Sequence, residues 1–144
     1  MKTIPVYELK KSKSEFPKET IKSSREASEF IRKFYTDDME IYESCFILLL
    51  NRANATIGYA KISQGGISGT VVDVRIIAKY AIESLASSVI LAHNHPSGNL
   101  NPSEQDDAIT KKCKQTLAIM DVTLVDHLIL TADGYRSYAD EGAL

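Results

Sequence analysis

Residues 90–107 read ILAHNHPSGNLNPSEQDD, and the rest of the chain is organised around this stretch. An apolar run leads into His93 and His95, and a loop rich in Pro, Gly, Ser and Asn then leads to Ser103 and Asp106. Alternate residues of an extended chain point to the same side, so the two imidazoles can meet at one point if the strand continues through them. Two neutral nitrogens and one carboxylate oxygen suit zinc, with the fourth position left for water. The stretch therefore predicts a catalytic zinc site with Asp106 as the third ligand.

Each of these residues also has an ordinary structural interpretation. Ser103 followed by an acid three positions later is typical of a helix capping box, and Asp106 in a first helical turn suits the helix dipole. A single histidine at a strand end is often only a polar terminus. Two of the three histidines of the chain, however, lie two residues apart beside a third type of ligand, and this spacing favours the metal site.

Length and composition indicate a soluble globular protein. The chain has 144 residues, of which 44% are hydrophobic and 25% are charged, which is enough for one core and too little for two ordinary domains. No apolar run approaches the roughly 20 residues that cross a bilayer, and the N-terminus lacks an apolar signal core. We therefore expect a cytoplasmic protein that does not bind membranes. The net charge of -2 gives no general attraction to nucleic acid.

Apolar periodicity and turn residues predict one α/β domain, a mixed β-sheet flanked by three helices. Residues 1–22 are expected to form a solvated, lysine-rich leader with a short strand at 4–9, and residues 23–144 the metal-binding domain. The expected helices span residues 23–35, 73–85 and 103–120, and the expected strands span residues 42–50, 56–63, 70–72, 88–92, 122–130 and 135–138.

Several side chains are assigned by their place in these elements. The first helix should end near Asp37-Asp38, and a central hairpin should join the strands 42–50 and 56–63. Apolar spacing places one group of residues on the buried face of the second helix, namely Ile76, Ile77, Tyr80, Ala81 and Leu85. The two cysteines, Cys45 and Cys113, lack CxxC spacing and are expected to be reduced core or near-core residues. Glycines at 65, 66 and 69 mark turns.

A hydrolytic metal centre also needs a group that carries a proton from the activated water to the leaving group. Glu43 directly precedes the apolar strand 44–50, so its carboxylate lies at a strand mouth where it can face the metal. Glu40 is the alternative. An acid at a strand start is also commonly a plain surface residue, and the sequence leaves this interpretation open.

These residues carry a resemblance to a known family. The pattern His-x-His, seven residues, Ser, two residues, Asp, with a glutamate before an upstream apolar strand, resembles the JAMM (MPN-plus) metalloprotease motif. The string from His93 to Gly98, together with Pro102-Ser103 and Asp126-His127, is more similar to the bacterial RadC-type JAB family, over roughly residues 23–144. The resemblance implies a cytidine-deaminase-like α/β fold. It also implies a role for each site residue: zinc ligands His93, His95 and Asp106, general base Glu43, and Ser103 as a residue that helps to hold the oxyanion of the tetrahedral intermediate.

Three classes of function remain open. The first is a zinc-dependent peptidase or isopeptidase acting on a peptide or isopeptide substrate, which the open coordination position and Glu43 favour. The second is a DNA repair factor, which the family name suggests; many RadC-type proteins carry a helix-hairpin-helix-like region, and residues 1–22 are too short for one. The third is a non-catalytic MPN-type interaction module. His127, after Asp126, is expected to be a core or edge histidine. A place behind a ligand imidazole or on the substrate side is the alternative for His127, and a place behind a ligand imidazole is the alternative for Asp126.

Overall fold

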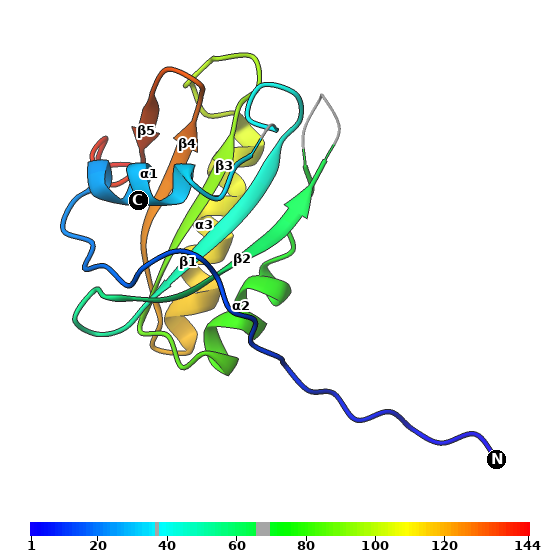
Figure 1. Cartoon of the computed structure of the whole chain (residues 1–144). Coiled ribbons are helices and arrows are strands. Elements are labelled where there is room, and N and C mark those ends of the chain that lie inside the picture. The colour runs from blue at the N-terminus through cyan, green and yellow to red at the C-terminus, as the bar shows by residue number, and fades with distance from the viewer. Residues whose placement is uncertain (37, 66–69) are drawn as a thin grey trace.

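Five strands in the order β2-β1-β3-β4-β5 form a mixed sheet (Figure 1). The computed structural model describes residues 1–36, 38–65 and 70–144. The central strand β3 pairs antiparallel with β1 and parallel with β4. The strands are β1 (Ser44–Leu50), β2 (Thr56–Gln64), β3 (Ser88–Asn94), β4 (Thr123–Leu130) and β5 (Tyr135–Ser137).

Helices cover both faces of this sheet, which confirms the predicted α/β architecture. In Figure 1, α1 (Ser24–Arg32) lies in front of the sheet and α3 (Glu104–Ile119) lies behind it. The helix α2 (Val74–Glu83) packs into the same core as α3. Successive residues of β1 face opposite sides of the sheet: Ile47 packs with α2 and α3, whereas Leu48 packs with α1. Burial on both faces explains why β1 reads as a continuous apolar run.

The end of α2 shows how the chain is turned back into the sheet. Leu85 follows the last turn with a left-handed φ of 56°, and the next amide, of Ala86, donates to the carbonyl of Ala81 at 3.0 Å. This is a Schellman-type ending, and Asp121, with φ of 58°, has the same place after α3. Leu85 therefore lies outside the helix and is exposed, so the expectation that it packs on the buried face is wrong.

The structure corrects further expectations about secondary structure. Ile76 is exposed, because the buried face of α2 is formed by Val74, Ile77 and Ala81 at spacings of three and four. Residues 4–9 and 70–72 form no strand, since neither segment has a ladder partner in the described part of the chain. The predicted hairpin of β1 and β2 forms, but it lies at one edge of the sheet. Asp37, Gly66 and Gly69 lie outside the described residues.

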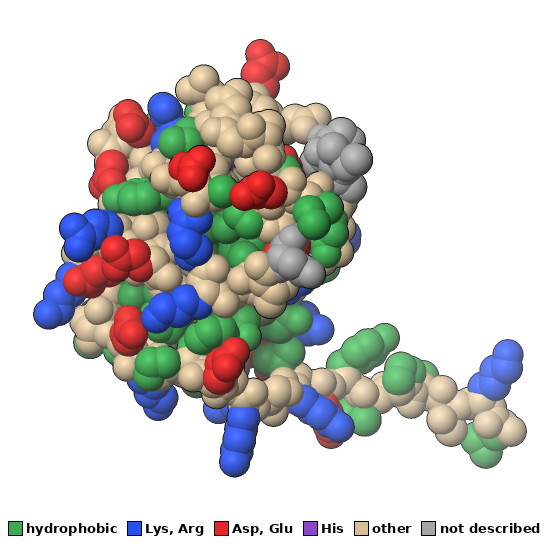
Figure 2. Space-filling view, turned by 45° about the horizontal axis from the view of Figure 1, so that its top comes forward, with side chains coloured by type: hydrophobic (Ala, Val, Ile, Leu, Met, Phe, Trp, Pro, Cys, Tyr) green, Lys and Arg blue, Asp and Glu red, His purple; other side chains and the backbone are tan. Residues whose placement is uncertain are grey.

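The N-terminal segment divides into an exposed part and a packed part. Residues 1–15 are exposed and project from the body of the molecule as an arm with hydrophobic and lysine side chains along it (Figure 2). Phe16 and Ile21 pack against the core beside α1, and Thr20 bridges to Ala55. Among the described helices, none combines the length and apolar character needed to span a membrane.

Candidate metal centre

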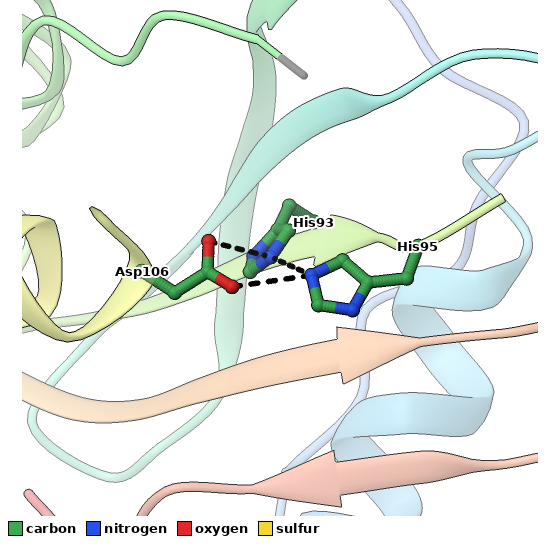
Figure 3. A group of neighbouring side chains, drawn as sticks. All are labelled: His93, His95 and Asp106. Atoms are coloured by element: carbon green, nitrogen blue, oxygen red, sulfur yellow. Dashed lines mark hydrogen bonds and ion pairs between the residues drawn. The ribbon is translucent and has the colours of Figure 1, made fainter. Parts of the chain in front are cut away.

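The end of β3 brings the two predicted histidine ligands to one point. His93 lies in the strand, and His95 directly follows it, held by a hydrogen bond from its amide to the carbonyl of Leu130 at 2.9 Å. The extended backbone directs both rings to the same side, with the Nε2 atoms 3.0 Å apart. Asp106, in the first turn of α3, faces both rings (Figure 3). Its Oδ1 lies 3.2 Å from Nε2 of His93, and its Oδ2 lies 3.2 Å from Nε2 of His95.

The geometry of this trio fits a zinc ion. Zinc with nitrogen and oxygen ligands at about 2.0–2.1 Å in a tetrahedron requires donor atoms about 3.3 Å apart. The two Nε2 atoms lie 3.0 Å apart, and each lies 3.2 Å from a different carboxylate oxygen of Asp106. One atom from each of the three residues can be chosen so that all lie within 4.8 Å of one another. Two imidazoles and one carboxylate are also the ligand types that zinc takes, and three protein ligands leave one position open. The structure thus brings His93, His95 and Asp106 together as the sequence predicts.

The charges of the trio suit a cation. Burial raises the pKa of Asp106, but hydrogen bonds from His93 and His95 outweigh this effect and hold the pKa well below its usual range. The carboxylate is therefore ionised throughout the ordinary pH range, as a metal ligand must be. The hydrogen bond to Asp106 in turn raises the pKa of His95, against the opposite effect of burial.

Asp106 is also fixed by the start of its helix. Ser103 is the N-cap of α3, and its Oγ accepts a hydrogen bond from the Asp106 amide at 3.0 Å. Asp106 Oδ2 accepts a hydrogen bond from the Ser103 amide at 2.8 Å, which completes a capping box. The ordinary interpretation and the metal interpretation of these two residues are therefore both compatible with one arrangement. The Ser103 hydroxyl proton has no acceptor among the described residues, so it is free to donate toward the pocket.

A pocket of about 730 Å³ lies over the ligand trio and includes Glu43. Antiparallel pairing of Cys45 with His93 explains this position, because it places the residue before β1 level with His95. Glu43 is close enough that its charge helps to raise the pKa of His95. Glu40 is exposed and does not line the pocket. Of the two glutamates, only Glu43 lines the pocket over the trio.

Asn94, between the two histidines, points to the other side of the strand and fixes the segment that carries Glu43. The Asn94 side chain is fully buried. Its Oδ1 accepts from the Ser44 amide at 2.8 Å, and its Nδ2 donates to the carbonyls of Met39 at 2.8 Å and Tyr42 at 3.0 Å. The sequence analysis missed this residue; its signal was an amide at the end of an otherwise apolar strand, which must find buried partners.

Behind the ligands, a second set of groups contacts the far nitrogen of each imidazole. Nδ1 of His95 lies 2.6 Å from the carbonyl oxygen of Asn99. Nδ1 of His93 lies 2.8 Å from Nε2 of His127, a buried residue of β4. His127 is therefore the core histidine that the sequence predicts, and it also contacts a ligand. Burial lowers the pKa of His127 well below its ordinary value. Its other nitrogen, Nδ1, contacts the hydroxyl of Thr110, a residue that the sequence analysis missed.

Asp126 does not lie behind the imidazole of His93 or His95, which was its alternative assignment. Its carboxylate accepts hydrogen bonds from the amides of His127 at 2.8 Å and Ala139 at 3.0 Å, and from the hydroxyl of Ser137 at 2.5 Å. These contacts hold β5 and the segment after it against β4. Asp126 is therefore a structural residue.

Comparison with known proteins places the chain among bacterial relatives. A family model described as "RadC-like JAB domain" matches residues 21–143. A UPF0758 protein of Flavobacterium johnsoniae is 50% identical over 101 residues, which are 70% of this chain and 44% of the relative. A UPF0758 protein of Porphyromonas gingivalis is 45% identical over 128 residues, 88% of this chain and 56% of the relative. One from Neisseria meningitidis is 38% identical over 105 residues, 73% of this chain and 47% of the relative. The chain spans about half the length of these curated relatives.

Proposed function

The chain belongs to the RadC-like JAB domain family, and from this premise we propose that it is a zinc-dependent hydrolase of the peptidase or isopeptidase type. His93, His95 and Asp106 hold the zinc, Glu43 is the general base, and Ser103 is a hydrogen-bond donor to the oxyanion. The observation that carries the proposal is the convergence of the three ligand residues, with nearest separations of 3.0–3.2 Å, in a pocket that Glu43 also lines.

His93, His95 and Asp106 would hold a zinc ion with one position open, and the bound metal would lower the pKa of a water to about 7 and so provide a nucleophile at neutral pH. The ligand set has the composition for this role, since one carboxylate and two neutral imidazoles leave a net positive charge on the centre.

Glu43 carries out the proton transfer. Its half-buried carboxylate lines the same pocket as His93, His95 and Asp106, so it can accept a proton from the attacking water and deliver it to the nitrogen of the leaving group. Asn94 holds the backbone around Glu43, so the carboxylate keeps its position through both steps. General acid–base catalysis of this kind is worth about 10²–10⁴-fold in rate.

Ser103 stabilises the negative charge that develops on the carbonyl oxygen of the substrate. Its Oγ is oriented by the hydrogen bond from the Asp106 amide, which uses the oxygen and leaves the hydroxyl proton available. A donor fixed in this way before the reaction lowers the barrier without a cost of reorganisation at the moment of bond formation.

The test is a screen of peptide and isopeptide libraries with the zinc-loaded protein, followed by matched glutamate variants. We expect Glu43→Gln to lower turnover on any hit by about 10²–10⁴-fold, with its zinc content and fold unchanged, whereas Glu40→Gln should turn over normally. Equal turnover of wild type and Glu43→Gln would contradict the assigned base. A protein that binds zinc but cleaves nothing in the screen would favour the non-catalytic module.

The net charge and the face drawn in Figure 2 do not favour a role in binding nucleic acid. The net charge is -2, and positive and negative side chains are interspersed on the face in Figure 2. A phosphate backbone is held by clustered positive charge. We therefore assign no nucleic-acid ligand to this domain.

A further inference from the structure

Three side chains from three different elements form a line of hydrogen bonds behind the metal centre. Thr110 lies on α3, His127 on β4 and His93 on β3. The Thr110 hydroxyl contacts Nδ1 of His127, and Nε2 of His127 lies 2.8 Å from Nδ1 of His93. His127 is fully enclosed, and its ring is stacked on that of Tyr138 with centroids 4.8 Å apart and planes 7° apart. Enclosure and stacking therefore hold the plane of the ring, and the hydrogen bonds at its two nitrogens hold its orientation within that plane.

The direction of each hydrogen bond follows from counting protons, starting at Thr110. A hydroxyl has one proton, and Thr110 Oγ1 lies 2.6 Å from the carbonyl oxygen of Asp106, which can only accept. The Thr110 proton is therefore given to this carbonyl. Toward His127 the hydroxyl oxygen can then only accept, so Nδ1 of His127 carries a proton.

The same count continues to the ligand. Enclosure favours a neutral His127 ring, and a neutral imidazole that is protonated on Nδ1 has a free electron pair on Nε2. The proton in the hydrogen bond between His127 and His93 must therefore be carried by Nδ1 of His93. In the neutral form of His93, which a zinc ligand must adopt, the unprotonated nitrogen is then Nε2, the atom that faces His95 and Asp106.

We propose that His127 is a positioning residue that fixes the tautomer and the ring orientation of His93. Thr110 determines which nitrogen of His127 carries the proton, and we call the three side chains Thr110, His127 and His93 the relay. The inference rests on the zinc centre of the proposed function and adds to it a group that prepares one ligand for the metal. Thr110 bonds to the backbone of Asp106, so the relay also ties the third ligand to the first. Groups that orient a ligand imidazole in this way typically contribute about 10–100-fold to metal affinity.

A spectroscopic test uses the wild-type protein alone. In the zinc-loaded protein, nitrogen-15 NMR of the histidine rings should show His127 protonated on Nδ1, with Nε2 as a hydrogen-bond acceptor. His93 should be protonated on Nδ1. A His127 ring that is protonated on Nε2, or on both nitrogens, would overturn the inference, because it could not accept a proton from His93.

An affinity test uses two variants of similar size. His127→Leu removes the acceptor and should weaken zinc binding by about 10–100-fold in competition with a chromophoric chelator. His127→Gln places an amide oxygen near the position of Nε2 and should recover most of that loss. Leu124→Val, a small change in the buried core on the same strand, should bind zinc like wild type. Equal losses in the Leu and Gln variants, or none in His127→Leu, would contradict the inference.

The outcomes separate this inference from the proposed function. A wild-type protein that binds no zinc would overturn both. A wild-type protein that binds zinc while His127 is protonated on Nε2 would overturn the relay alone. If His127→Leu does not fold, the wild-type spectrum decides.

Discussion

Single side chains at this site satisfy two demands at once. Asp106 caps its own helix and faces two imidazoles, and Ser103 completes the cap while its hydroxyl proton stays free. Under the proposed function, a mutation at either residue is therefore expected to change stability and chemistry together. Variants that retain one role and remove the other are needed to separate them.

Ser103 offers such a pair. Ser103→Asp keeps an N-cap acceptor, whereas Ser103→Ala loses it and should lower the free energy of unfolding by about 1 kcal/mol. Both variants lack a hydroxyl donor, so turnover on a substrate found by screening should fall by about 100-fold or more in each. Denaturant unfolding and steady-state kinetics measure the two effects. Near-normal turnover in a folded Ser103→Ala protein would leave Ser103 with the capping role alone.

The protonation of His95 sets the pH dependence of zinc binding. Its hydrogen bond to Asp106 raises its pKa above the ordinary value, against the effect of burial. Zinc takes the neutral ring and must displace that proton, so affinity is full above the raised pKa and falls by about tenfold per pH unit below it. Asp106 does not compete for protons in this range, because its own pKa is held well below its usual range. Chelator competition from about pH 8 to about pH 5 checks this, and a constant affinity would contradict it.

At the residue scale, the sequence was most informative where the site is local. His93, His95, Ser103 and Asp106 lie within one stretch, and strand and helix periodicity relate them directly. Thr110 and Asn94 were not predicted, because their partners come from elsewhere in the chain. The Thr110 contact to His127 spans 17 residues, and the Asn94 contact to Ser44 spans 50. Only the packing of α3 on the sheet and the pairing of the strands bring such partners together.

At the scale of elements, the segment before β1 depends on Asn94. Its amide satisfies three backbone groups of residues 39–44, and each buried polar group left without a partner costs about 1–3 kcal/mol. Asn94→Ala should therefore lower the free energy of unfolding by about 3 kcal/mol or more. Denaturant unfolding of the metal-free protein measures this.

Asn101→Ala is the matched control for this change. Asn101 is exposed in the loop before α3, and its side chain makes no hydrogen bond among the described residues. Its replacement should change the free energy of unfolding by less than about 0.5 kcal/mol. Similar losses in the two variants would mean that Asn94 does not fix the segment.

The elements themselves were predicted well where periodicity and caps agree. Ser23, Asp73 and Ser103 are N-caps close to the expected helix starts. The errors fall where pairing or a helix end decides the outcome. Leu85 has the apolar character of a core residue, but a left-handed backbone places it past the end of α2. Apolar spacing alone does not contain this information.

For the whole molecule, the two cysteines report on the integrity of the core behind the site. Cys45 and Cys113 are both buried in the core that α2 and α3 form with the sheet. Burial raises the pKa of the Cys45 thiol far above its ordinary value and that of Cys113 to about 12. Neither thiol should react with iodoacetamide in the native protein, and alkylation should appear with denaturant at the midpoint seen by circular dichroism. Rapid alkylation of either thiol without denaturant would contradict this packing.

Zinc content tests the central claim most directly. After incubation with zinc and removal of the excess, atomic absorption should find about one zinc per chain in the wild-type protein, as the three-ligand centre requires. His93→Ala and Asp106→Ala should lose this zinc while circular dichroism shows that they remain folded. Glu43→Gln, which lies in the pocket but outside the proposed ligands, should keep it. A wild-type protein without zinc, or stoichiometric zinc in both ligand variants, would contradict the account.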